Sequence, residues 1–234
     1  MEIYRPEKFK SSAYLPEVQA VLAAVIERDK NNPEAKNFLP NSLKIISDLS
    51  DKKDTLRHSQ RMTNLGYLLA KKLNFSKEEV EFFVEACLLH DVGKKDIAWK
   101  HRARLSEKFS KVDRREMKKH PKYSYQYLRW AGRSPRVYYP VYLHHAFQED
   151  PYPETKADFL KSLDGLEDKD VDNARLLAML DVFDIMAFGR PYVRISPIPL
   201  EDARQKLAEL FGEAGDGEMI EFLVGQYERI RELG

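Results

Sequence analysis

The apolar residues of this chain recur at intervals of three and four, and no long stretch alternates as a half-buried strand does. Residues that favour helix starts also occur along the chain, as this helical spacing of apolar residues would lead one to expect. Ser76 with Glu79 has the spacing of a capping box, and so does Asp113 with Glu116. Pro199 occupies a position that is favoured at a helix start. The pattern predicts an all-α bundle, with helices over residues 15–28, 55–73, 76–91, 113–121, 174–188, 199–211 and 218–233.

The same pattern divides the chain into unequal parts. Residues 1–40 hold one good helix and a turn-rich stretch, and they are predicted to form an N-terminal helical extension. Residues 41–234 are predicted to form the main domain. Within it, residues 148–172 are acidic and polar and are typical of a loop region. The segment 174–188 is almost wholly apolar, so we expect it at the centre of the fold.

Composition narrows the class of protein. The chain has 234 residues, enough for a substantial buried core, and its net charge of +1 gives no general attraction to nucleic acid or membranes. Its one cysteine, Cys87, excludes an intrachain disulfide. The sequence shows neither a signal-peptide pattern nor a membrane span. We therefore expect a cytoplasmic protein without nucleic-acid or membrane partners, and we predict no oligomeric state.

Candidate chemistry begins where an apolar helix ends in charged groups. The stretch ACLLHDVGKK, residues 86–95, carries His90, Asp91 and Lys94 at the edge of the predicted core, where unpartnered polar groups are costly. Of the six histidines only His101, in a basic stretch, has the setting of an ordinary surface residue. The others are His58, His90, His120, His144 and His145, and Asp181 lies inside the most apolar helix.

Each of these side chains alone has a structural interpretation, because a neutral imidazole needs only one donor and one acceptor. Together, however, each would need its own hydrogen-bond partner in or beside an apolar helix, whereas one shared metal centre would satisfy all of these polar side chains. Imidazole and carboxylate ligands suit Zn, Fe, Mn or Ni. Adjacent helical residues point about 100° apart, so His90-Asp91 and His144-His145 could each address two ions, with the aspartate bridging. Two metal ions about 3.5–4 Å apart are the usual arrangement for displacement at phosphorus.

At this point the chain resembles the HD-GYP branch of the HD metal-dependent phosphohydrolases. The resemblance lies in HSQRM (58–62), HDVGK (90–94), MKKHP (117–121), LHH (143–145) and LDVFDIMAFGRPY (180–192), in family order, and covers about residues 50–212. It implies an HD-domain helical bundle with a metal centre in its core, holding two or three divalent ions, commonly iron or manganese. The ligands implied by position are His58, His90, Asp91, His120, His144, His145 and Asp181, with Asp54 for a third ion.

Roles beyond metal ligation are expected as well. Lys94 stands just past the His90-Asp91 pair and near a helix end, where it could hold a phosphate oxygen, although composition alone would favour a solvated lysine beside Lys95. Asp91 and Lys94 are thus expected to act in catalysis. The resemblance adds two arginines. Arg190 corresponds to a phosphate-contacting arginine, and Arg194 stands one place beyond the family's usual basic position. Asp184 is expected to support a ligand or cap a helix rather than to bind metal.

The segment that gives the family its name has changed in this chain. Ala146 replaces a glutamate after the two histidines, and the glycines of the DGxGYP motif are absent. Only Pro151-Tyr152-Pro153 is similar to it. Glycine allows close backbone approach to a ligand, so the nucleotide pocket should differ.

Three functional hypotheses follow. The first is a metal-dependent phosphodiesterase with a role in signalling. It would hydrolyse a cyclic dinucleotide such as cyclic di-GMP by attack of a metal-bridged hydroxide. The second keeps the chemistry but changes the substrate to another nucleotide or phosphoester. The third is a module that binds a cyclic dinucleotide without turnover.

Overall fold

The computed structural model describes residues 13–30, 32, 35, 37–49, 54–97, 110–148, 150–153, 163, 165–189, 196–212 and 216–233. Every regular element within these ranges is helical, which confirms the predicted all-α class. The helices are α1 (Pro16–Asp29), α2 (Phe38–Asp48), α3 (Asp54–Lys72), α4 (Lys77–Leu89), η3 (Val92–Asp96), α6 (Lys111–Met117), α7 (His120–Trp130), α8 (Pro135–Leu143), α10 (Asp168–Phe188), α11 (Leu200–Phe211) and α12 (Asp216–Arg231).

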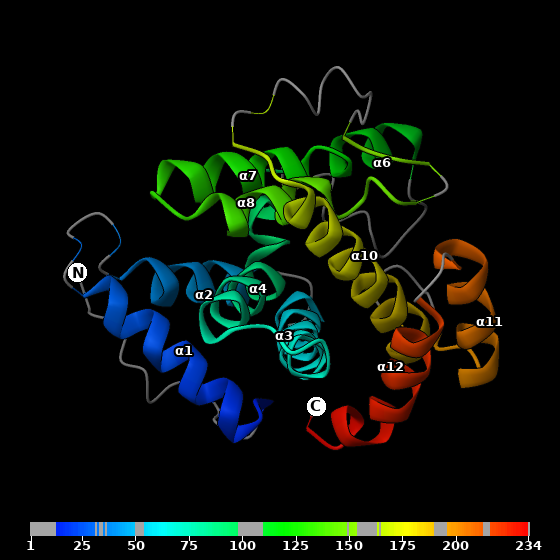
Figure 1. Cartoon of the computed structure of the whole chain (residues 1–234). Helices are drawn as coiled ribbons and strands as arrows, with labels where there is room; N and C mark the ends of the chain where they lie inside the picture. The colour runs from blue at the N-terminus through cyan, green and yellow to red at the C-terminus, as the bar shows by residue number, and fades with distance from the viewer. Residues whose placement is uncertain are drawn as a thin grey trace.

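The helices are arranged around α3, α4 and α10. Figure 1 shows α10 running from the α7–α8 pair at the top towards α11 and α12 at the lower right, with α1 and α2 on the opposite side of α3 and α4. The predicted central place of the apolar helix is confirmed, since Leu177, Leu180 and Phe183 of α10 are fully buried. Gly66 of α3 allows close approach to α4, because a Cβ at this position would overlap the Cys87 sulfur.

Several helix boundaries differ from the sequence prediction. Helix α4 starts with the predicted Ser76–Glu79 capping box but ends at Leu89, so the His90-Asp91 pair lies just beyond it. Helix α6 is capped by Ser110 paired with Asp113, three residues before the predicted start. Helix α10 begins at Asp168, within the predicted loop, because Glu167 and Asp170 form its capping box. At α6 and α10 an earlier side chain than predicted satisfies the first backbone N–H groups.

The N-terminal segment packs against the same core. The Leu15 N–H donates to Asn64 Oδ1 of α3 at 3.0 Å. At the other end of α1, Arg133 donates from Nη1 to Asp29 at 2.7 Å and pairs through Nε with Glu85 of α4 at 2.5 Å. The predicted division at residue 40 falls within α2 and stays a prediction. None of the described helices combines the length and apolar content of a membrane span.

Candidate metal centre

The predicted ligands that the structure describes converge in one buried cluster. His58 comes from α3, His90 and Asp91 from the end of α4, His120 from the start of α7, and Asp181 from α10. His144 and His145 follow α8 directly. All seven residues are at most 7% exposed. Residues far apart in the sequence are therefore brought together, as a shared metal centre requires.

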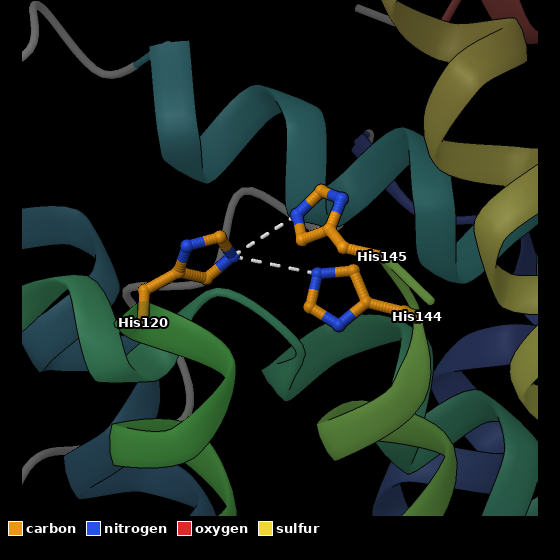
Figure 2. A group of neighbouring side chains, drawn as sticks. All are labelled: His120, His144 and His145. Carbon is orange, nitrogen blue, oxygen red and sulfur yellow. Dashed lines mark hydrogen bonds between the residues drawn. The ribbon is translucent and has the colours of Figure 1, made fainter. Parts of the chain in front are cut away.

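The cluster contains two histidine groups. In the first, His58 Nε2 lies 3.0 Å from His90 Nε2 and 3.2 Å from Asp181 Oδ1. In the second, His120 Nε2 lies 3.4 Å from His144 Nε2 and 3.3 Å from His145 Nε2. Figure 2 shows the three rings of the second group turned towards one another. Each group offers ligand atoms within 4.8 Å of one another, a spacing that could hold an ion.

Asp91 lies between the two groups. Its Oδ1 is 3.2 Å from His120 Nε2, in the second group. Its Oδ2 faces the first group, 3.6 Å from His90 Nε2 and 3.8 Å from His58 Nε2. One oxygen is thus turned to each histidine group, which is the geometry of a bridging carboxylate.

The histidines are oriented by the ends of their helices. The Nδ1–H of His90 donates to the Cys87 carbonyl at 2.8 Å, that of His120 to the Met117 carbonyl at 2.7 Å, and that of His144 to the Val141 carbonyl at 2.6 Å. Each acceptor lies three residues earlier, where a helix leaves carbonyls unsatisfied. This local bond explains why apolar helices end in histidine, and it fixes which ring nitrogen carries the proton.

The donor set fits a cation for an electrostatic reason. An Nδ1 atom that donates a hydrogen bond to a carbonyl must carry a proton. In the neutral rings of His90, His120 and His144, Nε2 therefore presents a lone pair. Burial lowers the pKa of His90 to about 4 and that of His144 to about 3, which keeps both rings neutral. Lone pairs that face each other at 3.4 Å cannot hydrogen-bond, whereas a cation between them satisfies both. His145 adds a buried Nδ1 that has no hydrogen-bond partner among the described residues.

Lys94 is buried rather than solvated. It is 6% exposed, and its ammonium pairs with Asp91 one turn earlier. Burial would raise the pKa of Asp91, but Lys94, followed by His90 and His120, holds it well below its ordinary value. Asp91 is therefore ionised, as a metal ligand must be.

The other predicted residues fall into two classes. Asp184 lies behind His58, where its Oδ2 accepts from the His58 Nδ1–H at 2.6 Å, a supporting contact of the predicted kind. Arg190, Arg194 and His101 lie outside the described residues, as does the side chain of Asp54.

Sequence analysis missed three side chains at this site. Arg61 contacts Asp184, and Ser124 accepts from the Gly93 N–H while donating to the His90 carbonyl. Tyr152 stacks on His145 with ring centroids 4.5 Å apart. For Arg61 a signal was present, because it stands one helical turn after His58. For Ser124 no local pattern points to the contact.

Comparisons with known proteins agree with this geometry. A model of the HD domain family matches residues 55–186. The chain is 33% identical over 138 residues to the cyclic di-GMP phosphodiesterase response regulator RpfG of Xanthomonas campestris, covering 57% of this chain and 33% of that protein. It is 28% identical over 208 residues to a cyclic di-GMP phosphodiesterase of Thermotoga maritima, covering 86% of this chain and 52% of that protein.

The chain thus spans about one third and about one half of the length of these two curated relatives. The predicted resemblance is confirmed, at modest identity. The family match covers more than half of the chain and includes all seven residues of the buried cluster, from His58 to Asp181. The chain belongs to the HD domain family.

Proposed function

We propose that this chain is a metal-dependent phosphohydrolase that hydrolyses a cyclic dinucleotide of the cyclic di-GMP type. The observation that carries the proposal is Asp91, whose two oxygens face the two adjoining histidine groups. Such a centre suits two divalent ions and in-line displacement at phosphorus. The names of the two relatives support the cyclic dinucleotide as substrate.

The ligand roles follow from the two groups. His58, His90 and Asp181 would hold one ion, His120, His144 and His145 the other, and Asp91 both. Iron or manganese is the proposed metal, since both accept imidazole and carboxylate ligands. Divalent ions bound there supply Lewis acidity, which lowers the pKa of water and offsets charge on the phosphate.

The proposed contacts to the substrate phosphates come from basic side chains of the chain itself. Lys94 is held beside Asp91, so its ammonium would bind a non-bridging phosphate oxygen at the edge of the centre. Arg190 and Arg194 are proposed to contact the same substrate, and Asp54 is proposed as a ligand for a third ion. Neutral imidazoles at His90 and His144 leave their Nε2 lone pairs available for ligation throughout.

The altered loop favours a second candidate, hydrolysis of another nucleotide or phosphoester. Tyr152 stacks on His145, and the Lys118 ammonium lies 5.2 Å from the centre of the Tyr152 ring. Lys118 also pairs with Asp150 at 2.5 Å. This segment covers one side of the second histidine group, where it would shape the substrate pocket.

One experiment separates these candidates. The chain is reconstituted with Mn²⁺ or, without oxygen, with Fe²⁺, its metal content is measured, and product formation is followed from cyclic di-GMP, other cyclic dinucleotides and simple phosphodiesters. We expect two or more ions per chain and cleavage of a cyclic dinucleotide. Asp91→Asn should lose metal and turnover, whereas Asp96→Asn, an exposed acid in the same segment, should change neither.

Each alternative has its own outcome. Cleavage of other phosphoesters only would favour the second candidate. Tight binding of intact cyclic dinucleotide with the metals present and no product would identify a binding module. A wild-type chain that takes up no metal would refute the metal-dependent reaction altogether.

A further inference from the structure

A second set of buried groups lies behind the ligand cluster. Arg61 of α3 binds both oxygens of Asp184 on α10, with Nε to Oδ1 at 2.6 Å and Nη2 to Oδ2 at 2.9 Å. The Arg61 guanidinium also lies 4.6 Å from the centre of the Phe188 ring. Asp184 is fully buried, and the Arg61 side chain is 15% exposed. This two-pronged contact fixes the plane of the carboxylate.

The fixed carboxylate in turn holds His58. Asp184 Oδ2 accepts from the His58 Nδ1–H at 2.6 Å, so the opposite nitrogen, Nε2, points at His90 and Asp181. The three groups form a chain of contacts from Arg61 through Asp184 to the proposed metal centre.

His58 needs this support more than His90, His120 and His144 do. His90, His120 and His144 each use a backbone carbonyl three residues earlier to orient the ring. His58 lies inside α3, where carbonyls are taken by the helix ladder, and its Nδ1 uses a side chain of another helix. Asp184 in turn needs a cation, because an unpaired carboxylate at full burial is strongly unfavourable.

We propose that Arg61 is a positioning residue that holds Asp184 in place, so that His58 presents Nε2 to the metal centre. The inference rests on the proposed function, because it assigns His58 as a ligand. Arg61 touches neither metal nor substrate in this assignment. Lysine cannot replace it fully, since an ammonium cannot make the planar two-pronged contact with a carboxylate.

The test compares Arg61→Ala and Arg61→Lys with Arg57→Ala. Arg57 lies on the same helix next to His58 and is exposed, so it is a matched control for loss of an arginine from α3. Metal affinity is measured by competition with a chelator. Loss of a supporting contact to a ligand histidine typically weakens metal affinity about 10–100-fold. We expect a loss in that range for Arg61→Ala, a smaller loss for Arg61→Lys, and no change for Arg57→Ala.

A second measurement needs no metal. Nitrogen-15 NMR of labelled histidine in the metal-free chain reports which nitrogen of His58 carries the proton. The wild-type and Arg57→Ala chains should show the Nδ1–H form, and Arg61→Ala should show a mixture of forms. Equal affinity and an unchanged His58 signal in Arg61→Ala would overturn the proposal.

The failure modes are distinguishable. If the wild-type chain binds no metal, the proposed function fails, while the NMR comparison still tests the Arg61 contact. If Arg61→Ala does not fold, as judged by circular dichroism, Arg61→Lys decides the matter. A weakened affinity and altered His58 signal in a folded Arg61→Lys chain support the positioning role, and wild-type values for both refute it.

Discussion

Lys94 is a cation held inside the ligand cluster, and its role can be separated from that of its neighbour. Its ammonium pairs with buried Asp91, whereas Lys95 pairs with exposed Asp96 and lies 4.7 Å from the centre of the Tyr127 ring. If Lys94 binds the phosphate, Lys94→Ala should lower kcat about 10²–10³-fold, as loss of an anion-stabilising donor typically does. Lys95→Ala should leave kcat unchanged.

Metal content measured on the same samples checks this assignment. The Lys94→Ala chain should keep its ions, because the histidine groups and Asp91 remain in place. Loss of metal together with activity would show instead that Lys94 acts by keeping Asp91 ionised and positioned.

At the same scale, the sequence predicted the histidines and acids of the buried cluster and one supporting residue, Asp184, but not the contacts of Arg61 and Ser124. His90-Asp91 and Asp181 stand out because polar groups interrupt apolar helices. The place of Arg61 one helical turn after His58 is visible in the sequence, but its contact with Asp184 depends on the way that α3 packs on α10. The contact of Ser124 depends on the packing of α7 on η3, which no local spacing encodes. The side chains that converge in the buried cluster could therefore be predicted from the sequence, whereas most of the contacts that orient them could not.

At the scale of helix packing, Gly93 allows η3, which follows the His90-Asp91 pair, to lie close to the start of α7, which carries His120. A Cβ at this position would overlap the Ser124 backbone nitrogen and the His120 carbonyl oxygen, so η3 packs on the start of α7 only with glycine. Gly93→Ala should lower the free energy of unfolding of the metal-free chain by about 1–3 kcal/mol, the usual cost of overpacking. It should also weaken metal binding by moving His120 away from Asp91.

Gly225→Ala is the matched control. Gly225 is an exposed residue of α12, and a Cβ there meets nothing within 4 Å. Alanine favours helix over glycine by up to about 1 kcal/mol, so this variant should be slightly more stable and bind metal normally. Urea denaturation and metal titration of both variants test the pair. Equal stability of Gly93→Ala and the wild type would contradict the close packing.

The helices themselves were predictable wherever one start signal dominated. The Ser76–Glu79 box was identified correctly, because no competing cap stands near it. At α6 and α10, polar residues spaced three apart gave several possible starts, and the capping boxes form at the earlier ones, Ser110 with Asp113 and Glu167 with Asp170. The local sequence thus predicts the existence of a helix more reliably than the residue at which it begins.

At the scale of the whole molecule, we expect the buried ligand cluster to lower the stability of the folded chain when no metal is bound. Five imidazoles and two carboxylates are enclosed among α3, α4, α7, α8 and α10, where apolar side chains would otherwise pack. The core of the protein therefore contains, among its apolar side chains, a cluster of groups that could hold an ion. Its stability should respond to both metal and protons.

Acid should destabilise the metal-free chain through its buried histidines. Burial lowers the pKa of His90 from 6.5 to about 4 and that of His144 from 6.5 to about 3. Between pH 6.5 and 4 the unfolded chain binds protons that the folded chain refuses, so the free energy of unfolding falls as the pH falls. The slope approaches about 1.4 kcal/mol per pH unit for each histidine. Urea denaturation from pH 7.5 to 4.5 measures it, and His144→Gln should give a shallower slope. A flat profile for the wild type would mean that these rings already accept protons in the folded state, and their Nε2 atoms would then not be free for a metal.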